Sequence, residues 1–96
     1  MDDLKILRKK IDIIDDKIIN LLVERFKIIE YVSEFKKNNN IEVIQESRIS
    51  EIVEKAKKKA LKNQINPRIF EKIYLNIIDL ACNLEKKIIE NKNGRI

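Results

Sequence analysis

A heptad pattern at the start of the chain constrains its fold more than any other feature. From Leu4 to about Lys37, apolar residues recur at alternating spacings of three and four positions. This spacing predicts a single helix over about residues 3–37, which at 1.5 Å per residue is roughly 50 Å long. The seam consists of Leu4, Leu7, Ile11, Ile14, Ile18, Leu21, Ile28, Val32 and Phe35.

The length of this helix predicts self-association. A compact globule of 96 residues has a radius of gyration of only ~12 Å, so the helix must extend beyond it with its apolar seam uncovered. A second copy of the chain would cover the seam. We therefore expect an intertwined helical homodimer.

The rest of the chain also favours helices. It has one Gly, and Pro67 is its only Pro, too few for the tight turns of a sandwich or barrel. A second helix is predicted over residues 46–62. Asn66 and Pro67 form a helix start, which predicts a third helix over 67–90 and a frayed tail over 91–96. The expected fold class is all-α, with residues 1–96 forming one domain of three helices.

Composition excludes several kinds of chemistry. There is no His, and Cys82 is the only Cys, so catalytic triads and His or thiolate zinc sites are excluded; no metal or cofactor is expected. The formal charge of +5 and pI near 9.4 suit a small polyanion, nucleic acid or a membrane surface without choosing among them. No apolar run is long enough to span a membrane, and the N-terminus is not a signal peptide. We expect a cytoplasmic protein.

A charged residue interrupts the heptad seam. Arg25 stands between Leu21 and Ile28, where an apolar residue is expected, and a buried charge needs a partner. That partner is either an anionic ligand or an internal carboxylate such as Glu85 or Asp79. Lys36 follows eleven residues later on nearly the same helix face, where it either helps to grip the same anion or is a solvated residue at the helix end.

Two further arginines are candidate ligand contacts. Arg48 opens the second helix, where backbone N–H groups also favour anions. Arg8 lies roughly 25 Å from Arg25 along the first helix, so it can share a site with Arg25 only across an antiparallel pair of chains. The other charged run, Lys55 to Lys59, is read as a solvated face, with nucleic-acid binding as the alternative. Cys82 is read as a small core residue.

The first-helix residues resemble a known family. Leu7-Arg8-Lys9-Lys10-Ile11-Asp12, Ile14-Asp15-Asp16-Lys17-Ile18 and Leu21-Leu22-Val23-Glu24-Arg25, with Lys36 eleven residues later, are similar to the all-helical chorismate mutases. The likeness extends from about Leu4 to Ile88. It implies an intertwined homodimer that converts chorismate to prephenate, in phenylalanine and tyrosine biosynthesis, without a cofactor. It also implies that Arg25, Arg48 and the partner's Arg8 bind carboxylates, that Lys36 points at the ether oxygen, and that Val32 forms an apolar wall.

Four positions depart from the commonest family pattern. Gln45 replaces an Asp, Ile49 replaces a Glu that meets the substrate hydroxyl, and Ala81 replaces a small polar residue. Glu85 stands where many relatives have a Gln that donates to the ether oxygen. Because only a protonated carboxyl can donate, we expect Glu85 to act in its neutral form; the alternative is that it pairs with Lys36 or Arg25.

Other activities remain open on the same scaffold. The apolar Ile49 and the Phe35-Lys36 pair also suit an isochorismate pyruvate lyase. A non-catalytic helical dimer or a nucleic-acid-binding module is a further alternative, although it leaves Arg25 on the seam unexplained. The sequence also allows docking to another enzyme of the shikimate pathway.

Overall fold

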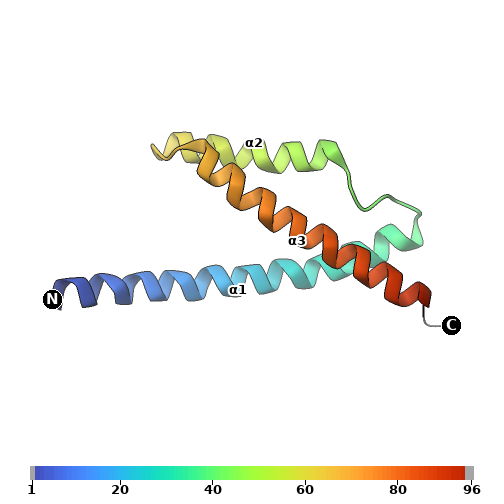
Figure 1. Ribbon diagram of the computed structural model, residues 1–96, viewed down its shortest axis with the longest axis horizontal. Helices are drawn as coiled ribbons and strands as arrows, with labels where there is room; N and C mark the ends of the chain where they lie inside the picture. Colours follow the sequence, from blue (N-terminus) through green and yellow to red (C-terminus); the bar gives the residue numbers. More distant parts are fainter. Residues whose placement is uncertain (1, 95–96) are drawn as a thin grey trace.

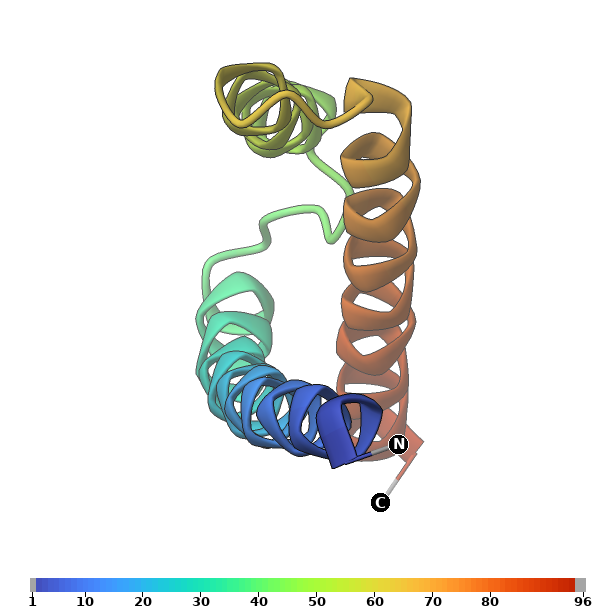
Figure 2. The same cartoon turned by 90° about the vertical axis from the view of Figure 1, so that its left-hand side faces the viewer.

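The chain forms three helices arranged around the last of them. The structure, a computed structural model, describes the backbone of residues 2–94 and the side chains of residues 2–90. Within this part, the elements are α1 (Asp2–Asn38), α2 (Glu46–Lys62) and α3 (Pro67–Gly94). α3 packs against both α1 and α2, whereas those two helices make no contact with each other. Both lie on the same side of α3 (Figures 1 and 2). The all-α prediction is confirmed.

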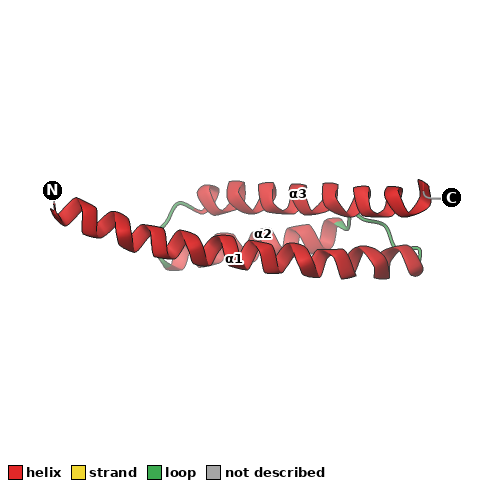
Figure 3. Cartoon of the chain, turned by 90° about the horizontal axis from the view of Figure 1, so that it is seen from below, coloured by secondary structure: helices red, strands yellow, loops and turns green. Residues whose placement is uncertain are grey.

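The molecule is elongated because α1 extends well past its neighbours. The principal extents are 59 × 27 × 14 Å and the radius of gyration is 17.3 Å, against ~12 Å for a compact chain of this length. The N-terminal half of α1 has no other helix beside it (Figures 1 and 3). The prediction of a protruding helix with a bare seam is confirmed: eight of the nine seam residues are exposed, namely Leu4, Leu7, Ile11, Ile14, Ile18, Leu21, Ile28 and Phe35.

The asparagine run ends α1 as its residue type predicts. Asn40 has a positive φ of 54°, a conformation that Asn tolerates better than most residues. The backbone N–H of Ile41 donates to the Lys36 carbonyl at 2.8 Å, and the Asn39 side chain donates to the Phe35 carbonyl at 2.9 Å. These bonds satisfy carbonyls at the helix end, and the link 41–45 then leads into α2.

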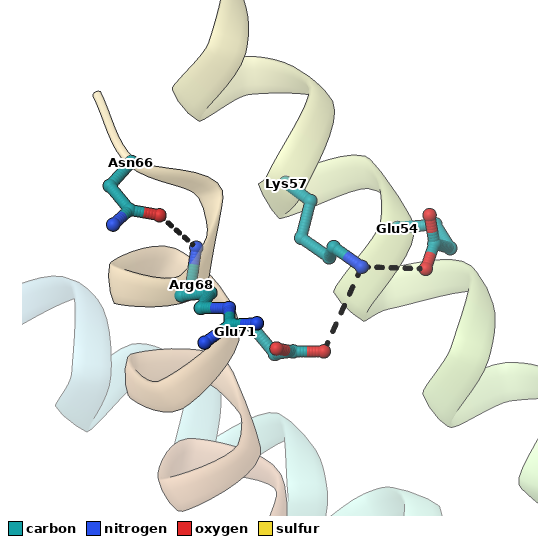
Figure 4. Close-up of polar contacts among 5 residues, drawn as sticks. All are labelled: Glu54, Lys57, Asn66, Arg68 and Glu71. Carbon is teal, nitrogen blue, oxygen red and sulfur yellow. Dashed lines mark hydrogen bonds and ion pairs between the residues drawn. The ribbon is translucent and has the colours of Figure 1, made fainter. Parts of the chain in front are cut away.

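A short turn joins α2 to α3. Gln64 has a φ of 59°, and the N–H of Ile65 donates to the Ala60 carbonyl at 2.9 Å. The predicted cap is confirmed, because the Asn66 side-chain oxygen accepts a hydrogen bond from the Arg68 N–H at 3.0 Å (Figure 4). Lys57 pairs with Glu54 of its own helix at 3.4 Å and links α2 to α3 through Glu71 at 3.8 Å.

The buried core is small and mostly consists of short side chains. Its apolar members are Val53, Ala56, Ala60, Ile78 and Ala81. In α1 only Ser33 is buried, and its hydroxyl donates to the Ile29 carbonyl at 2.8 Å. Because so little of α1 is covered, most of its apolar surface is available to a second chain. No helix within residues 2–94 has the length and apolar character needed to cross a membrane.

The end of α3 was predicted wrongly. The frayed tail expected from residue 91 is instead helical to Gly94. Asn and Lys lower helix propensity by only a few tenths of a kcal/mol each and do not stop a helix, and the first Gly comes at position 94. Residues 95–96 of the expected tail lie outside the described residues.

Candidate active site

A cavity of about 310 Å³ brings together all the predicted site residues except Arg8. It lies where the C-terminal half of α1, the link 41–45, the start of α2 and the C-terminal half of α3 meet. Among its lining residues are the predicted Arg25, Val32, Lys36, Gln45, Arg48, Ile49, Ala81 and Glu85.

Arg25 projects from α1 into this cavity with part of its charge unpaired. Its Nη1 atom is buried and has no hydrogen-bond partner. Within the described part of the chain it pairs with neither Glu85 nor Asp79, so the internal ion pair considered for Arg25 is wrong. Glu85 forms an ion pair with Lys36 instead, and Asp79 is exposed to solvent. A buried donor without an acceptor is costly, and a bound anion would satisfy it.

Lys36 and Glu85 form a charged pair at the other end of the cavity. Lys36 Nζ lies 2.9 Å from Glu85 Oε1, and both side chains are largely buried. The alternative that Glu85 pairs with Lys36 is therefore confirmed. The contact lacks the alignment of a hydrogen bond, because Oε1 has no hydrogen-bond partner. Lys36 Nζ also donates to the Val43 carbonyl at 2.8 Å, which ties the link 41–45 to α1.

The start of α2 supplies Gln45, Arg48 and Ile49. Gln45 occupies the N-cap position, but its side chain makes no capping hydrogen bond. Its carbonyl accepts bonds from the N–H groups of Arg48 and Ile49, both at 3.1 Å. The Arg48 guanidinium is exposed and pairs with Glu51 at 2.5 Å. A ligand carboxylate must therefore compete with Glu51 for Arg48.

The remaining lining is apolar and includes residues that the sequence reasoning missed. One is Cys82, which was predicted to be a core residue but is only partly buried and lines the cavity. Burial raises the pKa of its thiol, and the negative charge of Glu85 adds to the effect. A signal was available, since Cys82 lies three residues before Glu85 and so on the same helix face. The other missed residues are Ile28, Ile29, Val43, Ile52 and Ile78.

Arg8 lies elsewhere, as its distance along the helix predicts. It lines a separate depression on the N-terminal half of α1, together with Asp2, Lys5, Ile6, Lys9 and Asp12. Nothing within its own chain can bring it to the cavity, because α1 is one continuous helix from Asp2 to Asn38. Only a neighbouring chain could receive it.

The arrangement is suited to a small dianion with an apolar body. Three cationic side chains line the cavity against the single carboxylate of Glu85, and guanidinium groups bind carboxylates through paired hydrogen bonds. The apolar walls make the surroundings of a bound ligand less polar than water, which strengthens electrostatic interactions with it. Such a site can hold one conformation of a ligand and stabilise charge that develops on it.

Comparison with known proteins identifies relatives of this chain. The family model for chorismate mutase type II matches residues 7–86. The chain is 32% identical over 92 residues to a chorismate mutase of Methanocaldococcus jannaschii, covering 93% of each protein. It is 38% identical over 93 residues to a bifunctional chorismate mutase/prephenate dehydratase of Aquifex aeolicus, where the match covers 92% of this chain and 25% of the relative.

Proposed function

The chain belongs to the type II chorismate mutase family, and from that premise we propose that it rearranges chorismate to prephenate as an intertwined homodimer. The observation that carries the proposal is the buried, unpartnered Nη1 of Arg25, which lines the same cavity as Lys36 and Arg48. Chorismate has one carboxylate on its ring and a second on its ether side chain, which matches the charge and lining of this cavity.

The dimer follows from the exposed seam of α1. Its apolar residues have exposed fractions of about one half or more, for example 54% for Leu7 and 63% for Leu21. Contiguous apolar surface of this kind marks an association site. Two antiparallel α1 helices would bury each other's seams and carry Arg8 of each chain towards Arg25 of the other. In this arrangement the partner's Arg8 adds the fourth cation to the site.

Each residue then has a defined task in the reaction. The rearrangement is unimolecular and needs no nucleophile and no base. Arg25, Arg48 and the partner's Arg8 bind the two carboxylates and hold the side chain over the ring, which removes most of the conformational search. Lys36 uses one N–H on the Val43 carbonyl and lies in an ion pair with Glu85, so another N–H can face the ether oxygen, where negative charge develops.

Glu85 is the second donor to the ether oxygen, and it acts in its neutral form. In the empty cavity it pairs with Lys36. A protonated carboxyl can donate to the ether oxygen, whereas a carboxylate can only accept. We therefore expect kcat/KM to rise as the pH falls, and Glu85→Gln, whose amide donates at any pH, to flatten the profile. An unchanged profile in Glu85→Gln would contradict this role.

The apolar side of the cavity defines a second candidate activity. Ile49 and Ala81 line it where polar residues are common in the family, so the site offers fewer partners for the ring hydroxyl. An isochorismate pyruvate lyase, whose substrate carries its hydroxyl elsewhere on the ring, is the activity that this lining would favour in place of the mutase.

The deciding experiment is to incubate the purified protein with chorismate and, separately, isochorismate, and to identify the products. Prephenate from chorismate supports the mutase; pyruvate from isochorismate alone supports the lyase. Arg25→Ala should lower kcat/KM by roughly 10²-fold or more. Arg68→Ala is the matched control, because Arg68 is exposed and does not line the cavity.

A mixing experiment tests whether Arg8 acts in the partner's site. Arg8→Ala and Arg25→Ala homodimers each have two defective sites. A mixed dimer has one intact site, because the chain with Arg25→Ala supplies its Arg8 to the chain that retains Arg25. Random assortment should therefore restore about a quarter of wild-type activity. If each Arg8 served its own chain, both sites of the mixed dimer would remain defective.

The cellular setting is part of the same proposal. We place the enzyme in the cytoplasm, in phenylalanine and tyrosine biosynthesis. The Aquifex relative carries a prephenate dehydratase in the same chain. Docking to another enzyme of the shikimate pathway would bring this chain's product similarly close to the next active site.

A further inference from the structure

A second groove, of about 640 Å³, lies between α2 and α3 and has an unusual charge. Its rim carries six cationic side chains and a single carboxylate, that of Glu51. Phe70 and Tyr74 belong to its apolar part. The six cations are Arg25, Arg48, Lys55, Lys58, Lys59 and Lys62.

The four lysines of this groove form no ion pair within the part of the chain that the structure describes. Lys55, Lys58, Lys59 and Lys62 are all exposed. Lys55 lies three and four positions before Lys58 and Lys59, and Lys62 lies four and three positions after them, at helix spacings where like charges repel. An acidic occupant would relieve that repulsion, and two of the cations, Arg25 and Arg48, also line the active-site cavity. The groove therefore continues directly from the site.

The N-terminal half of α1 carries a stripe that contains two carboxylates in line with Arg8. Asp12 and Asp15 follow Arg8 by four and seven residues, so all three lie within a narrow arc of the helix at 100° per residue. On α2, Lys55 follows Arg48 by seven residues and Lys59 by eleven, again on one face. Both pairs separated by seven residues span about 10 Å.

The direction of the helices makes these two stripes coincide. α2 runs back along the molecule in the direction opposite to α1 (Figure 1). In an antiparallel pair of α1 helices, the partner's α1 therefore runs in the same direction as α2. When the partner's Arg8 reaches Arg25 and Arg48, the partner's Asp15 lies level with Lys55, and the partner's Asp12 lies between Arg48 and Lys55.

We propose that, where α1 of the second copy lies along this groove, its Asp12 and Asp15 fix the register of the dimer against Lys55 and Lys59. The inference rests on the dimer in the proposed function and adds the contacts that align it. A slip of one heptad would move Arg8 by about 10 Å, out of reach of the carboxylate it is proposed to bind. The charge pairing thus positions Arg8 without touching the substrate.

Charge reversal with compensation tests the pairing. Asp15→Lys and Lys55→Glu should each weaken the dimer by about tenfold or more in low salt, measured as the dissociation constant by sedimentation equilibrium. Combined in one chain, the two changes restore opposite charges and should return the dissociation constant to within about threefold of wild type. Because salt screens charges, the difference between single and combined variants should shrink at high ionic strength.

Matched controls separate pairing from net charge. Asp16→Lys makes the same charge change one residue away, but 100° around the helix from Asp15, and should weaken the dimer by less than threefold. Circular dichroism checks that each variant remains helical. The proposal is overturned if the wild type is monomeric, or if the combined variant weakens the dimer as much as the two single changes added together. It is also overturned if Asp16→Lys raises the dissociation constant as much as Asp15→Lys does. A wild-type dimer that fails to turn over chorismate would contradict the proposed function alone, since sedimentation reads the pairing without catalysis.

Discussion

Replacing Lys36 by Met should destabilise the protein far more than replacing a typical lysine. Lys36 Nζ lies 2.9 Å from Glu85 Oε1, and the two side chains are only 14% and 4% exposed. Lys36→Met leaves the Glu85 carboxylate buried beside an apolar side chain, and it also removes the 2.8 Å hydrogen bond to the Val43 carbonyl.

The expected loss of unfolding free energy is about 3 kcal/mol. Breaking a buried pair by removing one partner costs ~3–5 kcal/mol, and the lower end applies because the pair borders a cavity that water can enter. Loss of the hydrogen bond to the Val43 carbonyl costs a further ~1 kcal/mol, which is smaller than the width of that range. Against a typical total of ~5–15 kcal/mol, this is a large fraction. Met keeps the length and most of the apolar volume of Lys, so the effect reports on the charge.

Urea unfolding followed by circular dichroism measures this loss. All variants are compared at one protomer concentration, because dimerisation contributes to apparent stability. The combined Lys36→Met and Glu85→Gln variant should recover part of the loss, since a neutral amide is cheaper to bury than a charge. Lys57→Met is the control: Lys57 pairs with Glu54 and Glu71 at a more exposed position (Figure 4), where a pair is worth ~1 kcal/mol or less. Equal losses in Lys36→Met and Lys57→Met would refute the reasoning.

Two further predictions concern the cavity. Because the pKa of the Cys82 thiol is raised, little thiolate is present at neutral pH, so alkylation by iodoacetamide should be slower than for a free thiol and should accelerate only at more alkaline pH. The adduct should abolish turnover, and bound chorismate should protect the Cys82 thiol from alkylation. Mass spectrometry follows the adduct and an activity assay follows turnover. Modification without loss of activity would show that the thiol does not face the bound substrate. Glu51→Gln removes the competitor for Arg48, and should lower KM by about twofold to fivefold with kcat nearly unchanged; an unchanged or higher KM would mean that Glu51 does not restrain Arg48.

The sequence predicted the helices well because their signals are local. The heptad seam predicted both ends of α1 to within one residue, and Asn66 with Pro67 predicted the start of α3. The end of α3 was missed because residues 91–93 oppose a helix only weakly. Helix ends without a strong breaker depend on small propensity differences, which a sequence pattern does not resolve.

The candidate site was predicted in part for a different reason. Arg25 and Lys36 share one helix, so their spacing of eleven residues already placed them on one face. The pairing of Lys36 with Glu85 joins α1 to α3, and the Val43 carbonyl comes from the link between α1 and α2. Such contacts depend on how the helices cross, and periodicity along one helix carries no information about that. Cys82 was misread because a small apolar position fits a core and a cavity wall equally well.

The positions where this sequence breaks its own folding pattern are the ones that form the cavity. An apolar residue at position 25 would continue the seam, and an apolar pair at positions 36 and 85 would often be at least as stable as the buried ion pair. The chain instead buries a guanidinium nitrogen without an acceptor and a carboxylate held by one lysine. Selection for stability alone does not favour the unpaired guanidinium nitrogen of Arg25, whereas a site that binds an anion does. The proposed register extends this reasoning to the lysine-rich groove, whose cations would repel one another less if Asp12 and Asp15 of a second chain lay against them.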